Sequence, residues 1–190
     1  MADDRAETGH LQKQESGAGI LEDAHVAQAS GNTAEPQTLD LFSFVPFRLN
    51  RLAAEVSSAL AVEYRDRYAL DVPSWRILAT LGYRGDACTA QFIAACTRTH
   101  KSTISRAVTG LLGRGLLERI GNADDRREFT LRLTTEGTRL YRELIPHLLA
   151  RETAILSCLS TEEQAELSRL LGKLEHRLDL VQARKPASGA

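Results

Sequence analysis

Apolar residues repeat at helical spacing in the segment that begins near residue 40. Six of them stand three or four positions apart and predict one long helix over about residues 39–68. These six are Leu41, Val45, Leu49, Leu52, Val56 and Leu60. Asp71-Val72-Pro73 then starts a second helix, with Asp71 or Val72 as its N-cap and Pro73 at the first helical position, where proline is favoured. This helix is expected to reach Leu81. Gly82 and Gly85 are expected to bracket the turn that follows.

The middle of the chain predicts two helices and then a two-stranded hairpin. The first helix covers Ala87 to Cys96, and the second covers His100 to Gly113. Apolar residues mark one face of the second helix: Ile104, Val108, Leu111 and Leu112. Gly115 is expected in the left-handed conformation that ends a helix. Leu116 to Ile120 and residues 128–133 then predict two strands, since a turn-forming stretch of Gly, Asn and Asp separates them.

The last third of the chain predicts two further helices. Thr134 is a favourable N-cap for the first, which carries Pro146 as a potential kink. Ser160 and Glu163 have the spacing of a capping box for the second helix. A leucine stripe runs along that last helix: Leu167, Leu170, Leu171, Leu174 and Leu178. The expected fold class is therefore mainly α with one small β-hairpin.

Composition divides the chain into a polar tail and one domain. Residues 1–38 hold seven acidic residues against Arg5 and Lys13 and few apolar ones, which predicts a disordered or loosely packed N-terminal tail. The domain is expected over residues 39–180, with a central lobe at about 71–134 between helices at about 39–68 and 135–180. Residues 181–190 are expected to form a C-terminal tail.

Charge and motif content narrow the function classes. Residues 97–132 carry eight basic residues against four acidic ones, which favours a polyanionic partner. The sequence lacks a membrane-spanning apolar run and an apolar signal core, so a cytoplasmic protein is expected. Its three cysteines form no pair with metal-ligand spacing, and no nucleophile or phosphate-loop motif is present. Neither an enzyme nor a cofactor or metal site is indicated.

The order helix, helix, helix, two-stranded hairpin is that of a winged helix-turn-helix, in which one helix, here His100 to Gly113, enters the major groove of DNA. The exposed face of that helix offers hydroxyl and basic groups suited to phosphate and guanine: Lys101, Ser102, Thr103, Ser105 and Arg106. At the hairpin tip, Asp125 is placed to hold Arg127 extended toward a minor groove, while Arg126 meets phosphate. The alternatives are a solvated helix face and an ion pair that merely rigidifies the turn.

Linked motifs in this region resemble the MarR family of transcriptional regulators. They are Lys101-Ser102-Thr103-Ile104-Ser105-Arg106, Gly115-Leu116-Leu117-Glu118-Arg119, Asp125-Arg126-Arg127 and Leu133-Thr134-Thr135-Glu136-Gly137. The resemblance covers about residues 40–180. It implies a homodimer joined by the first and last helices that binds a palindromic operator in double-stranded DNA, usually as a repressor. By the same resemblance, Arg127 is the minor-groove residue, Asp125 supports it, and the helix face above supplies the recognition contacts.

Apolar residues at both ends of the domain independently favour a dimer. Leu41, Phe42 and Phe44 at one end and the leucine stripe at the other are too apolar to remain in water. We expect them to interleave across a two-fold axis. The alternative is that they pack within one chain.

The family resemblance also implies a small anionic effector, an aromatic carboxylate or an acyl-CoA thioester. Candidate residues combine arginines with aromatic side chains: Phe47, Arg48, Arg51, Trp75 and Arg76. Trp75 is alternatively a core residue. Residues 40–68 contain no cysteine, which disfavours the thiol-oxidation sensing known in the same family. The rival function is a winged-helix protein-protein interaction module without sequence-specific DNA binding.

Overall fold

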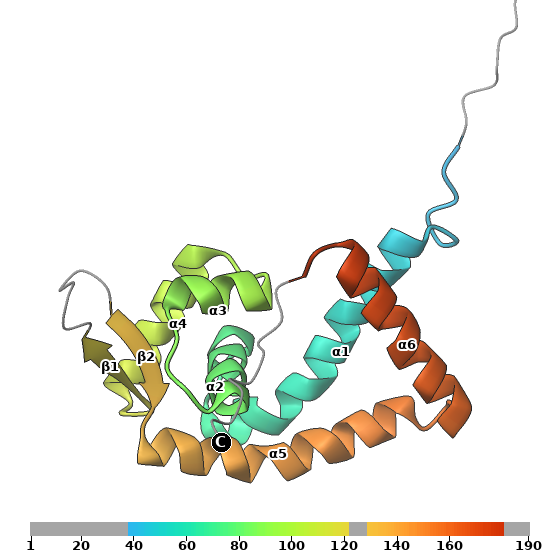
Figure 1. Ribbon diagram of the computed structural model, residues 1–190. Coiled ribbons are helices and arrows are strands. Elements are labelled where there is room, and N and C mark those ends of the chain that lie inside the picture. The colour runs from blue at the N-terminus through green and yellow to red at the C-terminus, as the bar shows by residue number, and fades with distance from the viewer. Residues whose placement is uncertain (1–37, 122–128, 181–190) are drawn as a thin grey trace, which may run out of the picture. The chain divides into compact units, whose positions relative to one another are not determined.

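The computed structural model describes residues 38–121 and 129–180. Within these ranges the chain forms six helices and one two-stranded sheet, and residues from Asp40 onward belong to one compact unit (Figure 1). The predicted N-terminal tail at 1–38, apart from its last residue, and the predicted C-terminal tail at 181–190 lie outside the described residues. The predicted hairpin-tip residues Asp125, Arg126 and Arg127 lie outside them as well.

Helix α1 spans Val45–Tyr68 and begins later than its apolar pattern predicts. Before the helix, the Asp40 carboxylate accepts the backbone N–H of Phe42 at 3.1 Å and the hydroxyl of Ser43 at 2.6 Å. These bonds hold a turn, and the proline that follows Val45 occupies the first helical turn, where its missing N–H costs nothing. The predicted start near residue 39 therefore precedes the observed start by about six residues, nearly two turns.

Helix α2 spans Val72–Arg84 and is capped as predicted, with the Asp71 side chain accepting the Ser74 N–H at 2.8 Å. It continues through Gly82, which the sequence pattern placed in a turn. The ring of Tyr141 lies against Gly82, and a Cβ there would stand 2.5 Å from Tyr141 Cε1, so close packing inside the helix favours glycine at this position. Gly85 alone forms the left-handed helix end, at φ 69°.

Helix α3 spans Ala90–Thr97, so it starts later than predicted. Cys88 is extended and exchanges two backbone hydrogen bonds with Leu131, at 3.1 and 2.8 Å. Thr89 then caps the helix by accepting the Phe92 N–H at 3.1 Å. Helix α4 follows at Lys101–Gly113, after a turn in which Arg98 adopts φ 50°.

The remaining elements match their predicted order. Strands β1 (Leu117–Gly121) and β2 (Phe129–Leu133) pair antiparallel, and α5 (Thr135–Leu156) and α6 (Thr161–Arg177) follow. The predicted caps at Thr134 and Ser160 are both present, the second as a full capping box. Helix α5 continues as one helix through Pro146.

The buried core joins α1 to α5 and the hairpin but leaves α6 outside. Its largest fully buried side chains come from the lobe between α1 and β2 and from α5: Tyr64, Leu70, Ile77, Leu78, Leu81, Ile93, Ile104, Leu111, Leu131 and Leu144. An ion pair of 2.6 Å between Arg151 and Glu63 adds a link between α5 and α1. Helix α6 has no buried residue, so its leucine stripe is exposed in the single chain.

Candidate nucleic-acid interface

Helix α4 separates an apolar face from a polar one. Ile104, Val108 and Leu111 are buried against the neighbouring helices α2 and α3. The predicted contact residues lie on the other side: Lys101, Ser102, Ser105 and Arg106 are exposed and Thr103 is half-buried. The structure therefore brings these five predicted residues together in the first two turns of one helix, where backbone N–H groups also point outward.

The residue that caps this helix was not predicted from the sequence. His100 Nδ1 accepts the Ser102 N–H at 3.3 Å and lies 2.7 Å from the Ser102 hydroxyl. Further along, Arg106 Nε donates to the Ser102 carbonyl at 3.4 Å, which holds the arginine stem along the helix. Histidine is uncommon among N-caps, so composition gave no signal for this role.

The hairpin is fixed to the lobe at its base. Leu117 and Leu131 are buried in the core, and β2 is bonded through Leu131 to the extended segment before α3. On the outer face, Glu118 and Arg132 form a cross-strand ion pair of 2.8 Å. These contacts hold the two strands against the lobe, and the hairpin lies beside α4 (Figure 1).

An aromatic contact lies at the tip end of the described strands. The Arg119 guanidinium is 4.5 Å from the centre of the Phe129 ring, across the pair. Both side chains are exposed. This contact adds a positive group to the hairpin that the predicted contact set did not contain.

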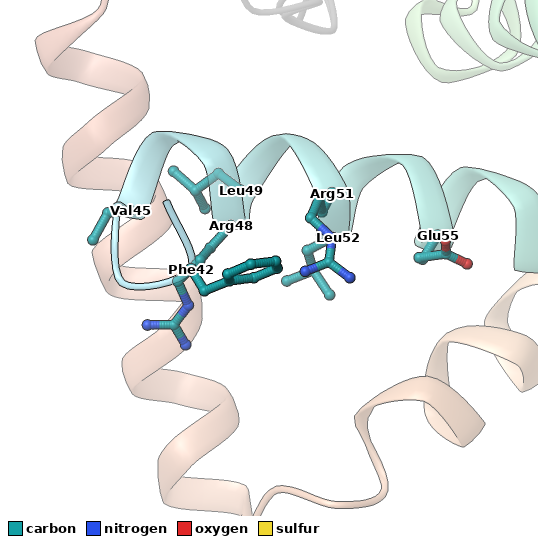
Figure 2. Close-up of a pocket in the computed structure, with 7 residues that line it drawn as sticks. All are labelled: Phe42, Val45, Arg48, Leu49, Arg51, Leu52 and Glu55. Atoms are coloured by element: carbon teal, nitrogen blue, oxygen red, sulfur yellow. The ribbon is translucent and has the colours of Figure 1, made fainter. Parts of the chain in front are cut away.

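The candidate effector residues fall into two groups. Phe47, Arg48 and Arg51 belong to the start of α1, where a hollow of about 440 Å³ is lined by Arg48, Arg51, the acidic Glu55 and neighbouring apolar residues (Figure 2). The Arg51 guanidinium lies 5.5 Å from the ring centre of Phe42 and 5.7 Å from that of Phe47. Cationic and aromatic groups are therefore combined in the first turns of this helix.

The second group lies far from the first within one chain. Trp75 is stacked between Tyr64 and Tyr141, at centroid distances of 5.8 and 6.2 Å, so it joins α1, α2 and α5. Arg76 donates to the Thr99 hydroxyl at 3.4 Å. Thirteen residues of α1 separate Arg51 from Tyr64, which corresponds to about 20 Å along the helix axis. One chain alone does not unite the two groups.

The thiols and the acidic residues offer no further site in the described ranges. Burial raises the pKa of the Cys88 thiol to about 11, and burial also raises the pKa of Cys96, so both are protonated near neutrality. No cluster of His, Cys, Asp or Glu with metal-binding geometry occurs among the residues that the structure covers. None of the described helices combines the length and the hydropathy of a membrane span.

A basic helix in a helix-helix-hairpin lobe defines a winged-helix DNA-binding protein. Comparison with known proteins is consistent with this class. The model of the MarR family matches residues 70–128. The transcriptional regulator PecS of Dickeya dadantii is 32% identical over 132 residues, which cover 68% of this chain and 79% of PecS. The chain belongs to the MarR family of transcriptional regulators.

Two further proteins illustrate the range of the similarity. The transcriptional repressor YetL of Bacillus subtilis is 28% identical over 88 residues, covering 46% of this chain and 53% of YetL. CouR from Rhodococcus jostii, whose crystal structure is bound to p-coumaroyl-CoA, has a TM-score of 0.62 and 22% identity. That match covers 73% of this chain and 94% of CouR, and it establishes the common fold.

Proposed function

We propose that this MarR-family regulator is a homodimeric repressor that a small anionic ligand releases from a palindromic operator. The observation that carries the proposal is the exposed polar and basic face of α4 next to a firmly based hairpin. Lysine and arginine donate to phosphate or to guanine O6 and N7, and hydroxyls bind phosphate. Lys101, Ser102, Thr103, Ser105 and Arg106 are the proposed recognition-helix contacts. Arg127 is the proposed minor-groove residue, Asp125 its support, and Arg126 a phosphate contact.

The homodimer is supported by the apolar residues that one chain leaves in water. Along α6, Leu170 and Leu174 are each 45% exposed, and Phe42 before α1 is 68% exposed. A continuous apolar stripe of this kind is costly in water and is typical of an interface. Pairing the terminal helices of two chains would cover it and would set two α4 helices at a fixed spacing for two half-sites.

The proposed ligand is an aromatic carboxylate or an acyl-CoA thioester. The cluster of Arg48, Arg51 and Phe47 on α1 supplies charge for an anion and a ring for stacking. Trp75 and Arg76 would contribute only where dimer formation closes the distance between the two groups. The thioester bound to CouR supports this ligand class for a protein of the same fold.

Fluorescence anisotropy with promoter DNA tests the proposal. We expect tight binding that weakens as salt rises, because phosphate contacts release counterions, and release by one member of a panel of aromatic acids and their CoA thioesters. Binding that is blind to sequence, or absent, would instead favour the protein-interaction module. Arg127→Ala should lower DNA affinity while the dimer stays intact, with Arg142→Ala, an exposed arginine on α5, as the charge-matched control.

A further inference from the structure

Arg114 connects the end of α4 to the end of α1. It is the C-cap residue of α4, and its own N–H donates to the Gly110 carbonyl at 3.1 Å. Its side chain reaches back to another helix: Nη2 donates to the Tyr68 carbonyl at 2.7 Å and Nη1 to the Ala69 carbonyl at 3.0 Å. One guanidinium therefore binds two successive carbonyl groups.

Those carbonyl groups are the ones that a helix end leaves without partners. Tyr68 is the last residue of α1, and Ala69 is its C-cap at φ 48°. The last carbonyls of a helix have no intrahelical donors and carry the negative end of the helix dipole. A planar guanidinium donates two hydrogen bonds in a fixed direction, so Arg114 fixes an angle between the two helices as well as a distance.

The same residue of α1 is also bonded to α5. The Tyr68 hydroxyl donates to Glu143 Oε1 at 2.7 Å, and Glu143 in turn forms a 3.3 Å ion pair with Arg139. The Tyr68 carbonyl thus accepts a hydrogen bond from Arg114 at the end of α4, and the Tyr68 hydroxyl donates one to Glu143 of α5. The end of α1 is a junction at which both helices are anchored by polar bonds.

The proposed DNA contacts lie at the opposite end of α4. The thirteen residues of this helix place Lys101 about 20 Å from Arg114 along the helix axis. A change of angle at the anchored end would therefore move the contacting end by a larger distance. Arg114 itself is too far along the helix to be one of the proposed contacts in the first two turns.

We propose that Arg114 is a positioning residue that sets the orientation of α4 against α1, so that the DNA-contacting end of α4 follows the movement of α1. This inference rests on the proposed function, in which α4 reads the operator and α1 belongs to the dimer. Arg114 acts through the orientation of α4 and not through contact with DNA. It provides a direct polar path from the dimer helix to the recognition helix.

The test compares wild type with Arg114→Ala and Arg114→Lys in anisotropy titrations, using the operator and an unrelated duplex of equal length. In Arg114→Ala we expect a loss of operator affinity of roughly five- to tenfold. Affinity for the unrelated duplex and the salt dependence should not change, because no phosphate contact is removed. The operator affinity of Arg114→Lys should lie between those of the wild type and Arg114→Ala, since an ammonium group does not reproduce the two-carbonyl geometry.

Tyr68→Phe is the matched control at the same junction. It removes the hydroxyl bond to Glu143 but keeps the carbonyl that Arg114 binds. We expect a lower melting temperature with operator affinity unchanged. If general loosening of the junction were responsible, both variants would lose operator affinity to the same extent. All titrations are run at a temperature where circular dichroism shows each variant folded.

Two outcomes of the Arg114→Ala titrations would overturn the inference. Wild-type operator affinity in folded Arg114→Ala would exclude positioning, and an equal loss on both duplexes with a shallower salt dependence would identify a direct phosphate contact. Failure of the wild type to prefer any operator would contradict the proposed function instead. Amide hydrogen exchange measured without DNA tests the role of Arg114 independently of the proposed function. Exchange within α4 should accelerate in Arg114→Ala and not in Tyr68→Phe. Unchanged exchange in Arg114→Ala would contradict the inference.

Discussion

Gly137, in the first turn of α5, packs directly on the backbone of the residue that leads into the hairpin. A Cβ at this position would overlap the carbonyl oxygen of Leu116. We predict that Gly137→Ala lowers the free energy of unfolding by about 1–3 kcal/mol, because backbone atoms do not yield as a flexible side chain would. Urea denaturation followed by circular dichroism measures the change.

Gly110 provides the matched control for that substitution. It lies inside α4, and a Cβ added there would meet no atom within 4 Å. Alanine there should stabilise the protein by roughly 0.5–1 kcal/mol, since it reduces the entropy of the unfolded chain without a clash. Equal effects of the two substitutions would refute the close contact at Gly137.

The buried thiol of Cys88 predicts a loss of stability in alkali. Burial raises its pKa from 9.0 to about 11, so between these values the unfolded chain releases a proton that the folded chain retains. The contribution of this thiol is therefore complete below pH 9 and is lost as pH rises through about 11. Unfolding titrations from pH 8 to 11 should show a smaller decline in Cys88→Ala than in the wild type.

The contribution of Cys88 is measured as the difference in stability loss between wild type and Cys88→Ala, because other buried groups titrate in the same pH range. Burial also raises the pKa values of Cys96, Tyr64 and Tyr141, which act in the same direction. Only the part removed by Cys88→Ala belongs to Cys88. Parallel curves for wild type and variant would show that this thiol does not carry the predicted linkage.

Single residues differed in how well the sequence predicted their roles. Asp71, Thr134 and Ser160 were predicted as helix caps because their side chains accept backbone N–H groups and each precedes an apolar helical pattern. His100 caps α4 with a ring nitrogen, a role that histidine rarely takes, so the pattern did not indicate it. The contacts of Arg114 could not be predicted from the sequence because its partners lie 45 and 46 residues away along the chain.

At the scale of elements, Thr134 joins three of them. Its hydroxyl accepts the Gly137 N–H at 3.0 Å to cap α5 and donates to the Gly115 carbonyl at 2.7 Å, where α4 ends. Its own N–H donates to the Leu116 carbonyl at 3.2 Å, just before β1. We predict that Thr134→Ala costs about 1–2 kcal/mol of unfolding free energy in urea titrations.

Serine separates the hydroxyl from the rest of the threonine side chain. Thr134→Ser keeps both hydroxyl bonds, so its stability should lie close to that of the wild type. If Thr134→Ser and Thr134→Ala were equally destabilised, loss of the methyl group would explain the effect and the capping role would be wrong.

Element boundaries departed from prediction where side-chain contacts that apolar spacing does not show are present. The long helix begins at Val45 because Asp40 holds a turn ahead of it. Helix α2 continues past Gly82, which packs against Tyr141, and ends only at the left-handed Gly85. Apolar spacing predicts that a helix exists. Apolar spacing gives no information on the side-chain bonds and backbone conformations at which a helix begins and ends.

At the scale of the whole molecule, the exposed leucine stripe on α6 predicts an obligate dimer. The double substitution Leu170→Glu with Leu174→Glu should yield a monomer in analytical ultracentrifugation, because it places charges in the proposed apolar interface. Operator affinity should fall by roughly a hundredfold, since the two half-sites would then be bound independently.

Tyr83→Glu is the control for added charge. Tyr83 is an exposed residue of α2 in the DNA-binding lobe, at 57% exposure, and its substitution should leave the dimer intact. A dimeric Leu170→Glu, Leu174→Glu variant would show that α6 does not form the interface. The leucine stripe would then need another explanation.

The distance between the two groups of candidate effector residues could not be predicted from the sequence. Phe47, Arg48 and Arg51 were chosen by residue type, as were Trp75 and Arg76, and type carries no information on distance. Helix α1 separates the groups within one chain, so they could act together only across the proposed dimer. The five candidate DNA-contact residues of α4 could be grouped from the sequence alone, because residues 101–106 fall within two turns of one helix.

The stack around Trp75 has a practical optical consequence. The chain contains a single tryptophan, and it lies between tyrosines contributed by α1 and α5. Intrinsic emission therefore comes from the place where the first, second and fifth helices meet, without any label. Changes in its wavelength or quenching would follow rearrangement of these helices in real time as DNA or an effector is added.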